Sequence, residues 1–317
     1  MANLAFVFPG QGSQSVGMLA ELAEAFPVIN KTFNQVSDAL GYDLWHLVQN
    51  GPEARLNQTE YTQVAMLTAD VAVFRALKQQ ELPRPRFMAG HSLGEYAALV
   101  CANALSLQTA AKLVEKRGQL MQQTVPMGLG AMAAIVGLTD EQVVELCKQS
   151  SDSQLKVSPA NYNAIGQVVI AGHSAAVENA IRNAEEAGAK LAKLIPVSVP
   201  CHCDLLKDAA TAFESDLNAA DFRVPDFAVI SNVNLAVYQS IQQMRTLLKE
   251  QLYRPVRWVE TIQLFKTNGV EHIIECGPGR VLSGLVKRID RSLSAACVHD
   301  NDSMEAVLSQ WEMSESY

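Results

Sequence analysis

The sequence predicts an α/β protein in which a large domain carries an inserted subdomain of ferredoxin-like order. Two observations support this prediction. Apolar strand segments alternate with glycine-rich loops and helical patterns through most of the chain, which is typical of α/β folds. Between residues 126 and 198 the pattern changes to six short elements in the order βαββαβ.

Composition limits the partners that this chain can bind. Its 317 residues carry a net charge of −8, whereas a phosphate backbone is bound through a surplus of lysine and arginine. Apolar stretches stay short of the roughly 20 residues that cross a bilayer, and the apolar start lacks the basic residues of a signal peptide. We therefore expect a cytoplasmic protein that binds neither nucleic acid nor membrane.

The large domain begins with a buried strand at residues 4–8 that leads into a glycine-rich loop at residues 10–14. This loop lacks both the Lys-Ser/Thr ending of a P-loop and the spacing of a dinucleotide site, so it gives little support to nucleotide binding. A helix is expected at about 60–80 and a short strand at 86–89. Strand, loop and helix thus alternate up to the insertion.

The inserted subdomain is predicted from strands and helices in direct succession, namely strands at 131–137, 155–162, 167–172 and 189–196 and helices at 140–149 and 174–187. Prolines punctuate both ends of this block. We assign residues 126–198 to the subdomain, and residues 1–125 and 199–317 to the catalytic domain. A cleft between the two bodies would be the natural place for a ligand.

The segment Gly90-His91-Ser92-Leu93-Gly94 matches G-x-S-x-G directly after an apolar strand and directly before a helical run. This is the context of a nucleophile elbow, in which a sharp turn exposes the serine and flanking glycines avoid steric clashes. Amides at the start of the following helix can hold an oxyanion. The large domain is therefore expected to be α/β-hydrolase-like, with Ser92 as nucleophile.

A serine nucleophile needs a base, and the chain has six histidines. His202 is the best candidate because it follows the expected end of the last subdomain strand, where its side chain would face the cleft. His91 is expected to point away from the tight turn and to act as a structural donor. The others are expected at the surface, in loops or at a strand end: His46, His173, His272 and His299.

Arg117 falls within the apolar stripe of a helix that begins near Ser106. A guanidinium on a buried face requires an anion. A salt bridge in the core, or a stem that extends to water, would be the structural explanations. The functional explanation is a bidentate clamp for a substrate carboxylate, which the planar guanidinium suits better than lysine.

The six cysteines are scattered through a chain large enough to fold without disulfides, so we expect reduced thiols. Cys201-His202-Cys203 could indicate zinc. Adjacent side chains diverge, however, and no second ligand pair follows at zinc spacing. We expect no metal.

The chain contains, in this order, the motifs Pro9-Gly10-Gln11-Gly12-Ser13-Gln14, Gly90-His91-Ser92-Leu93-Gly94-Glu95, Arg117, Gly166-Gln167-Val168-Val169-Ile170-Ala171-Gly172, His202, Gln251-Leu252-Tyr253-Arg254-Pro255-Val256 and Gly277-Pro278-Gly279. With these motifs it resembles the bacterial fatty acid synthesis acyltransferase family, the malonyl-CoA:acyl carrier protein transacylases. It resembles more distantly the acyltransferase domains of fatty acid and polyketide synthases. The resemblance covers nearly the whole chain.

The resemblance implies an acyltransferase domain in which Ser92 is acylated and His202 accepts and returns the proton. The backbone amides of Gln11 and Leu93 would hold the oxyanion, and Arg117 would pair with the malonyl carboxylate. The backbone carbonyl of Gln251 would orient the histidine, so that a Ser–His dyad replaces a triad.

The same resemblance places Asn161, Tyr162 and Asn163 along the acyl pocket. Two positions depart from the family pattern. Cys201 stands where many relatives have serine, and Tyr162 is unusual for its segment. Neither removes a catalytic group, but Tyr162 leaves fine acyl selectivity open.

The implied reaction is a ping-pong cycle. Malonyl-CoA acylates Ser92, CoA leaves, and the phosphopantetheine thiol of acyl carrier protein takes the malonyl group. The CoA thioester is a substrate, and no cofactor is required. Docking of the usually acidic carrier protein to an acidic enzyme requires a local basic patch. Candidates are Arg280, Lys287, Arg288 and Arg291, or Lys190 and Lys193, although either group could be an ordinary solvated face.

Two other functions remain as alternatives. A serine esterase or thioesterase of the α/β-hydrolase class would share the elbow, but it places an acid between serine and histidine in chain order and has no use for a buried arginine. A non-catalytic relative could dock a carrier protein only. The presence of both Ser92 and His202 argues against it.

Overall fold

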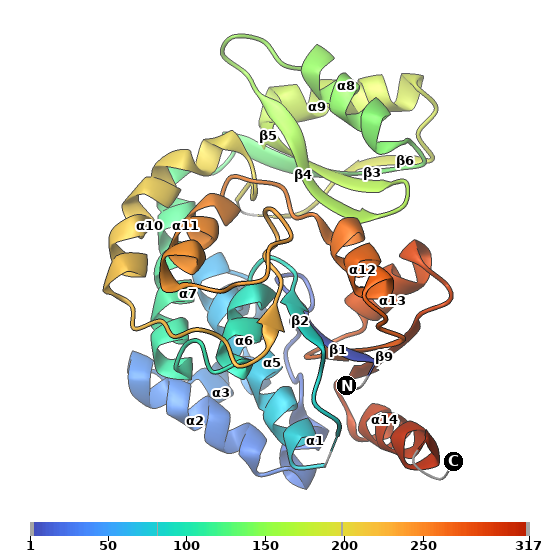
Figure 1. Cartoon of the computed structure of the whole chain (residues 1–317). Helices are drawn as coiled ribbons and strands as arrows, with labels where there is room; N and C mark the ends of the chain where they lie inside the picture. The colour runs from blue at the N-terminus through green and yellow to red at the C-terminus, as the bar shows by residue number, and fades with distance from the viewer. Residues whose placement is uncertain (1–2, 81, 198, 315–317) are drawn as a thin grey trace.

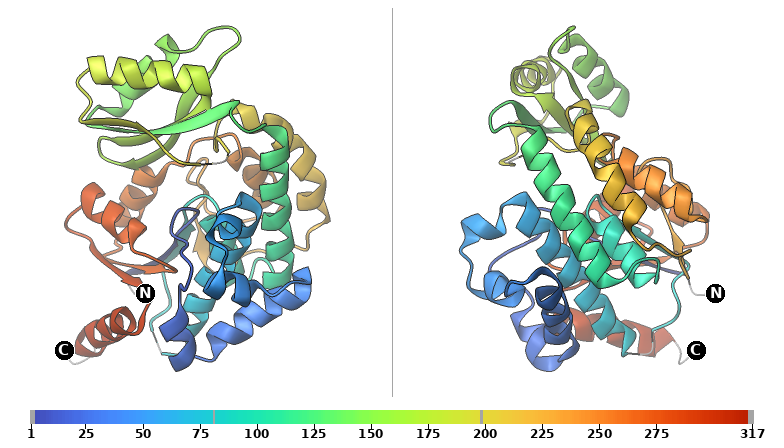
Figure 2. Two further views of the ribbon diagram at one scale, coloured as in Figure 1. Left: turned by 180° about the vertical axis from the view of Figure 1, so that it is seen from behind. Right: turned by 90° about the vertical axis from the view of Figure 1, so that its left-hand side faces the viewer.

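The strands of the protein form two separate sheets, one in each of two bodies (Figure 1). The computed structural model describes residues 3–80, 82–197 and 199–314. The smaller body stands at one end of the molecule when it is seen from behind and from the side (Figure 2). Ser198, which ends the predicted subdomain, lies outside the described residues.

The larger body contains a parallel sheet with the strand order β7-β2-β1-β8-β9. Its central strand β1 (Leu4–Phe8) is entirely buried, as predicted. Alternate side chains of β1 enter two different cores, because successive residues of a strand point to opposite faces. The other strands are β2 (Phe87–Gly90), β7 (Ala228–Val229), β8 (His272–Cys276) and β9 (Ser294–Val298).

Helices cover both faces of this sheet, which explains why β1 reads as a continuous apolar run. One face packs against α12 (Trp258–Thr267) and α13 (Val281–Ile289). The other packs against a larger group that includes α5 (Thr59–Lys78), which matches the helix expected at 60–80. The remaining helices of this body are α1 (Ala20–Ala25), α2 (Val28–Leu40), α3 (Leu44–Asn50), α4 (Glu53–Leu56), α6 (Gly94–Cys101), α7 (Leu107–Thr124), α10 (Lys207–Ala219), α11 (Ile241–Gln251) and α14 (Asn301–Ser314), with a 3-10 turn at Asp204–Leu206.

The smaller body has an antiparallel sheet of order β4-β5-β3-β6, with α8 and α9 on its outer face (Figure 1). This order confirms the predicted ferredoxin-like subdomain. Its elements are β3 (Gly130–Val136), α8 (Asp140–Gln149), β4 (Val157–Ala164), β5 (Gln167–His173), α9 (Ser174–Glu186) and β6 (Leu191–Leu194). The last strand is shorter than the predicted 189–196, and Pro196, which has no N–H for the ladder, cannot extend it.

Backbone hydrogen bonds join the two bodies beside the parallel sheet. The Tyr162 amide donates to the Val256 carbonyl at 3.0 Å, and the Val256 amide donates to the Ala160 carbonyl at 2.8 Å. Val256 follows α11, so β4 is fixed to the segment that leaves this helix. The junction brings subdomain residues close to the carboxyl end of the parallel sheet.

Candidate active site

The loop between β2 and α6 forms a tight elbow around Ser92, whose backbone adopts a left-handed φ of 54°. A Cβ atom at Gly90 would lie 1.8 Å from the Gly94 carbonyl carbon, and one at Gly94 would lie 2.1 Å from the Phe8 carbonyl oxygen. Only glycine fits at either position. The two glycines thus let the elbow close and rest on the end of β1.

Asn232 supports this strained turn from a loop far away in sequence. Its Oδ1 accepts a hydrogen bond from the Ser92 amide at 2.8 Å, and its Nδ2 donates to the Gly90 carbonyl at 2.7 Å. The sequence offered no sign of this role, because 140 residues separate Asn232 from Ser92.

His202 is the histidine that reaches the serine. Its Nε2 lies 2.8 Å from Ser92 Oγ, and its Nδ1 lies 2.8 Å from the Gln251 carbonyl oxygen. The strand expected to lead to it ends at Leu194. His202 instead lies in a loop with a left-handed φ of 61°, where its amide donates to the Leu252 carbonyl. Nδ1 therefore faces a backbone carbonyl, and no carboxylate among the described residues accepts from it as the acid of an esterase triad would.

The environment of His202 keeps its ring uncharged. The side chain is 2% exposed, and burial followed by the charge of Arg117 lowers its pKa to about 3. The Gln251 carbonyl can only accept, so the neutral ring carries its proton on Nδ1 and offers Nε2 to the serine hydroxyl. This is the state that a general base requires.

We expect nitrogen NMR of the ring to find His202 as the neutral Nδ1–H tautomer from pH 8 down to pH 5. Because its pKa is depressed, the ring stays uncharged at every pH well above 3. A His202 signal that changes to the charged form between pH 8 and pH 5 would contradict the buried, arginine-facing geometry.

The remaining histidines lie elsewhere. His91 Nε2 contacts Asn163 Oδ1 at 2.8 Å and its ring packs edge-on against Trp258, which matches the predicted structural role. His46 is exposed on α3, His173 ends β5, and His272 and His299 are half-buried. The acidic neighbour Asp204 pairs with Lys207.

Arg117 on α7 is 2% exposed, so its stem does not extend to water. It forms no ion pair with a carboxylate within the part of the chain that the structure describes. Nη1 donates to Gln63 Oε1 at 2.7 Å, Nη2 donates to Gln251 Oε1 at 3.0 Å, and Nη2 lies 3.5 Å from Ser92 Oγ. Both structural explanations thus fail, and a buried cation faces the nucleophile with only neutral partners.

Gln251 takes part through its side chain as well as its carbonyl. Its Nε2 donates to the Ser92 carbonyl at 3.0 Å and to Glu95 Oε2 at 2.6 Å. Burial raises the pKa of Glu95 to about 7, against hydrogen bonds from Tyr238, Gln251 and Asn232 that lower it. Sequence reasoning assigned no role to Gln63, Glu95 or the Gln251 amide.

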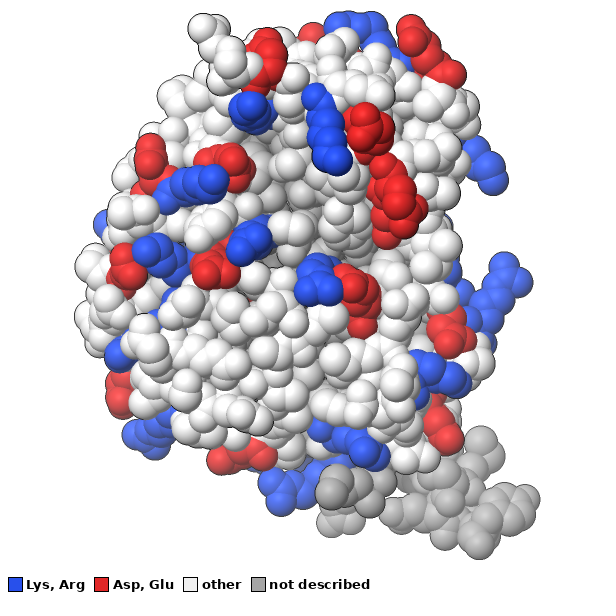
Figure 3. Space-filling model, turned by 45° about the horizontal axis from the view of Figure 1, so that its top comes forward, with Lys and Arg blue, Asp and Glu red and all other residues white. Residues whose placement is uncertain are grey.

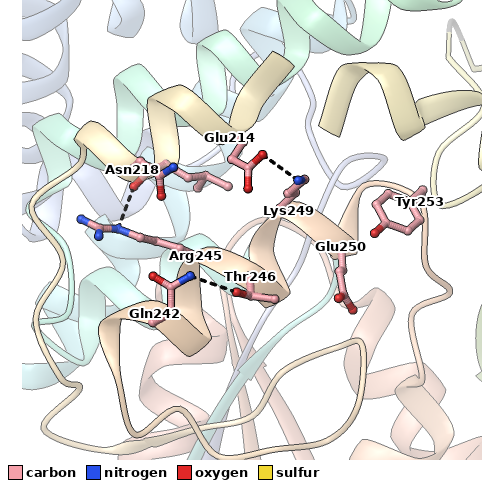
Figure 4. Close-up of a pocket in the computed structure, with 9 residues that line it drawn as sticks. Glu214, Asn218, Gln242, Arg245, Thr246, Lys249, Glu250 and Tyr253 are labelled. Atoms are coloured by element: carbon pink, nitrogen blue, oxygen red, sulfur yellow. Dashed lines mark hydrogen bonds and ion pairs between the residues drawn. The ribbon is translucent and has the colours of Figure 1, made fainter. Parts of the chain in front are cut away.

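Helix α11, which ends at Gln251, is anchored on α10 at a small pocket of about 120 Å³ (Figure 4). Lys249 pairs with Glu214 at 2.7 Å. The Arg245 guanidinium donates to the Leu217 and Ala220 carbonyls at the end of α10. Both cations in this pocket already have partners, so it positions α11 and offers no free charge to a ligand.

The loop after β1 passes close to the elbow. A Cβ at Gly10 would lie 2.6 Å from the His91 carbonyl oxygen and 3.8 Å from the Leu93 amide nitrogen. The amides of Gln11 and Leu93 donate no hydrogen bond to another group within the described residues. They remain the candidates for an oxyanion hole.

The three residues expected to line an acyl pocket are divided between two surroundings. Asn163 bonds to His91 beside the nucleophile. Asn161 is 6% exposed and bridges to Val256. Tyr162 packs against the core of the small subdomain, because neighbouring residues of a strand point to opposite faces.

The match to an acyl transferase domain model spans residues 5–311. The chain is 52% identical to a malonyl CoA-acyl carrier protein transacylase of Haemophilus influenzae, over 97% of this chain and 98% of that protein. The solved transacylase of Coxiella burnetii is 49% identical with a TM-score of 0.95, and the match covers 97% of each chain.

Another solved relative is a malonyl-transacylase in complex with its type II PKS acyl-carrier protein. It is 50% identical with a TM-score of 0.95, over 97% of this chain and 99% of that one. Sequence and structure therefore agree along nearly the whole length. The chain belongs to the acyl transferase family and, within it, to the malonyl CoA-acyl carrier protein transacylases.

Proposed function

We propose that Ser92 and His202 carry out the transfer of a malonyl group from malonyl-CoA to acyl carrier protein. The chain is an acyl-carrier-protein S-malonyltransferase that supplies malonyl groups for fatty acid biosynthesis. The assignment of its residues rests on one observation above all. A buried guanidinium without an anionic partner faces a serine that is hydrogen-bonded to a neutral histidine.

In the first half-reaction, His202 Nε2 takes the hydroxyl proton while Ser92 Oγ attacks the thioester carbonyl of malonyl-CoA. The oxyanion that forms is held by the amides of Gln11 and Leu93. The C–S bond then breaks, and the thiolate of CoA leaves with the proton from His202. Ser92 now carries the malonyl ester.

In the second half-reaction, the phosphopantetheine thiol gives its proton to His202 and attacks the ester. The bond to Ser92 Oγ breaks, and His202 returns the proton to the serine. Arg117 holds the free carboxylate of the acyl group in both halves, so the same clamp serves both substrates. A buried site also limits attack by water on the intermediate.

Intact-mass measurement after mixing with malonyl-CoA tests this assignment. The protein should gain one malonyl group, and addition of acyl carrier protein should remove it. A peptide map should place the group on Ser92. Acylation of any other residue would refute the proposed nucleophile.

We also propose that the protein acts in the cytoplasm. All six cysteines are unpaired in the structure, as is usual in a reducing compartment. No described helix is long and apolar enough to cross a membrane.

The carrier protein is proposed to dock at a groove of about 1000 Å³ between α13 and the small subdomain. Lys287, Arg288 and Arg291 line it, and the Lys190 amide bonds to the carbonyl of Val136, another lining residue. Three members of the first predicted basic group therefore line the groove, and Lys190 of the second group is joined to its wall by a backbone hydrogen bond. Basic and acidic side chains are intermixed on the face seen in Figure 3, and neither charge dominates it.

Charge reversal is proposed at four exposed cations that have no ion-pair partner among the described residues, namely Lys287, Arg291, Lys190 and Lys193. It should raise KM for the carrier protein and weaken the dependence of this KM on salt concentration. Acylation by malonyl-CoA should not change. Lys148→Glu, on α8 outside the groove, is the control. Unchanged kinetics toward the carrier protein would refute the docking site.

A further inference from the structure

Glu95 is a buried carboxylate directly behind the nucleophile. It lies in the first turn of α6, and its side chain is 0% exposed. Three groups from distant parts of the chain donate to it, namely Gln251 Nε2 at 2.6 Å, the Asn232 amide at 3.3 Å and the Tyr238 hydroxyl. No cation within the described residues pairs with it directly. The transfer mechanism above does not use this group.

Three neighbours fix which way the Gln251 amide points, namely Glu95, the Ser92 carbonyl and Arg117. A backbone carbonyl can only accept hydrogen bonds, and so can Glu95 above its pKa of about 7, where it is largely ionised. Gln251 must therefore direct both Nε2 hydrogens toward Glu95 and the Ser92 carbonyl. Its Oε1 is left facing Arg117, where it accepts from Nη2 at 3.0 Å. The reverse orientation would direct N–H groups at a guanidinium that has only donors.

Through neutral neighbours, Glu95 is connected to two parts of the site, the Arg117 guanidinium and the Ser92 turn. Through Gln251 it fixes Nη2 of Arg117, 3.5 Å from Ser92 Oγ. Through the Asn232 amide it holds the residue that supports the Ser92 turn. Because its bonds go to neutral groups, it does not occupy the face of the guanidinium that a substrate carboxylate needs.

We propose that Glu95 is the positioning residue of the acyl-carboxylate clamp, and that it selects for malonyl groups by holding the Gln251 amide with its oxygen toward Arg117. The inference rests on the proposed role of Arg117. It adds a specificity determinant that makes no contact with the acyl group.

The variant Glu95→Gln keeps the shape but removes the charge that anchors Gln251 Nε2, so that the Gln251 amide holds Arg117 less firmly. Acylation of Ser92 should be followed by rapid-quench intact mass, with malonyl-CoA and acetyl-CoA in parallel. We expect kcat/KM for malonyl-CoA to fall about 10- to 100-fold, mainly through KM, as for loss of one hydrogen bond to a charged group. Acetyl-CoA should change less than about threefold, since it does not use the clamp. An equal loss for both substrates, or a gain for malonyl-CoA, would overturn the proposal.

A double-mutant cycle separates this inference from the proposed function. In an Arg117→Ala background, Glu95→Gln should no longer alter the ratio of kcat/KM for malonyl-CoA to that for acetyl-CoA. The hydrogen bonds from Glu95 through Gln251 then no longer lead to a guanidinium. If Arg117→Ala alone left that ratio unchanged, the proposed role of Arg117 would fail. If it changed the ratio and Glu95→Gln did not, only the role of Glu95 would fail.

Glu275→Gln is the matched control. Glu275 is another buried glutamate, but its carboxylate accepts from the Leu282 and Ser283 amides at the start of α13. Its replacement should lower the melting temperature and leave the malonyl-to-acetyl ratio unchanged. If Glu275→Gln shifted this ratio as much as Glu95→Gln does, a general loss of stability would explain the effect of both variants. That result would overturn the proposal.

Should Glu95→Gln not fold, Gln251→Met tests the connection between Glu95 and Arg117 directly. It removes the amide and keeps the backbone carbonyl that orients His202. We expect the same preferential loss of malonyl transfer. Equal losses for malonyl-CoA and acetyl-CoA would refute the positioning role.

Discussion

Replacement of Ser92 with alanine is expected to abolish acyl-enzyme formation. Among the serines of the described chain, Ser92 is the one that an elbow places against a neutral histidine and a buried guanidinium. Removing its Oγ leaves no atom to form the ester. Intact mass after mixing with malonyl-CoA should therefore remain that of the free protein, and transfer to acyl carrier protein should be undetectable.

The fold should survive this change, because the bonds that hold the elbow are made by backbone atoms of Ser92. An unchanged melting curve is the control. As a companion, His202→Ala should slow acylation by about 10²–10⁴-fold, the usual contribution of a general base. Persistent acylation of Ser92→Ala would show that another residue is the nucleophile. A near-normal rate for His202→Ala would show that His202 is not the base and would make His91 the next candidate.

The elbow could be predicted from sequence because its determinants are local. Two glycines four residues apart, a preceding apolar strand and a following helix are enough to require the turn. The ferredoxin-like order was predictable for a similar reason, since each of its elements has its own periodicity.

The support behind the serine could not be predicted, because it depends on contacts over long separations. Asn232 and Gln251 are 140 and 159 residues from the Ser92 groups they bind. The local pattern around Asn232 is that of an ordinary loop, and the motif that contains Gln251 assigned a role only to its backbone carbonyl. Glu95 sits within the motif, but its meaning depends on partners that only the fold brings to it.

The acyl pocket was expected to be lined by Asn161, Tyr162 and Asn163, which are consecutive residues of strand β4. Three consecutive residues cannot all line one face, because side chains alternate along a strand. In β4 the register also shifts between Pro159 and Asn161 and between Tyr162 and Ala164. Such bulges redirect side chains in ways that a pattern of period two does not foresee. Tyr162 accordingly packs into the subdomain while Asn163 reaches the elbow.

Arg117→Ala is expected to lower malonyl transfer by roughly two to three decades while acetyl transfer holds or rises. A carboxylate that enters a buried site loses hydration, which only a fixed cation and good hydrogen bonds replace. Breaking such a pair costs of order 3–5 kcal/mol, at about 1.4 kcal/mol for each decade of rate or affinity. Acetyl groups carry no charge to pair, and a neutral side chain removes the cost of burying an uncompensated guanidinium.

The substitution Arg117→Lys distinguishes charge from geometry. Lysine would keep the cation but cannot hold Gln63 and Gln251 on two nitrogens while facing the substrate, because its ammonium is a single point. It should therefore retain only part of the malonyl activity. Competition between malonyl-CoA and acetyl-CoA on both variants decides the matter. A loss of equal size for both acyl groups would mean that Arg117 is structural, and that the selection of the diacid must come from another residue.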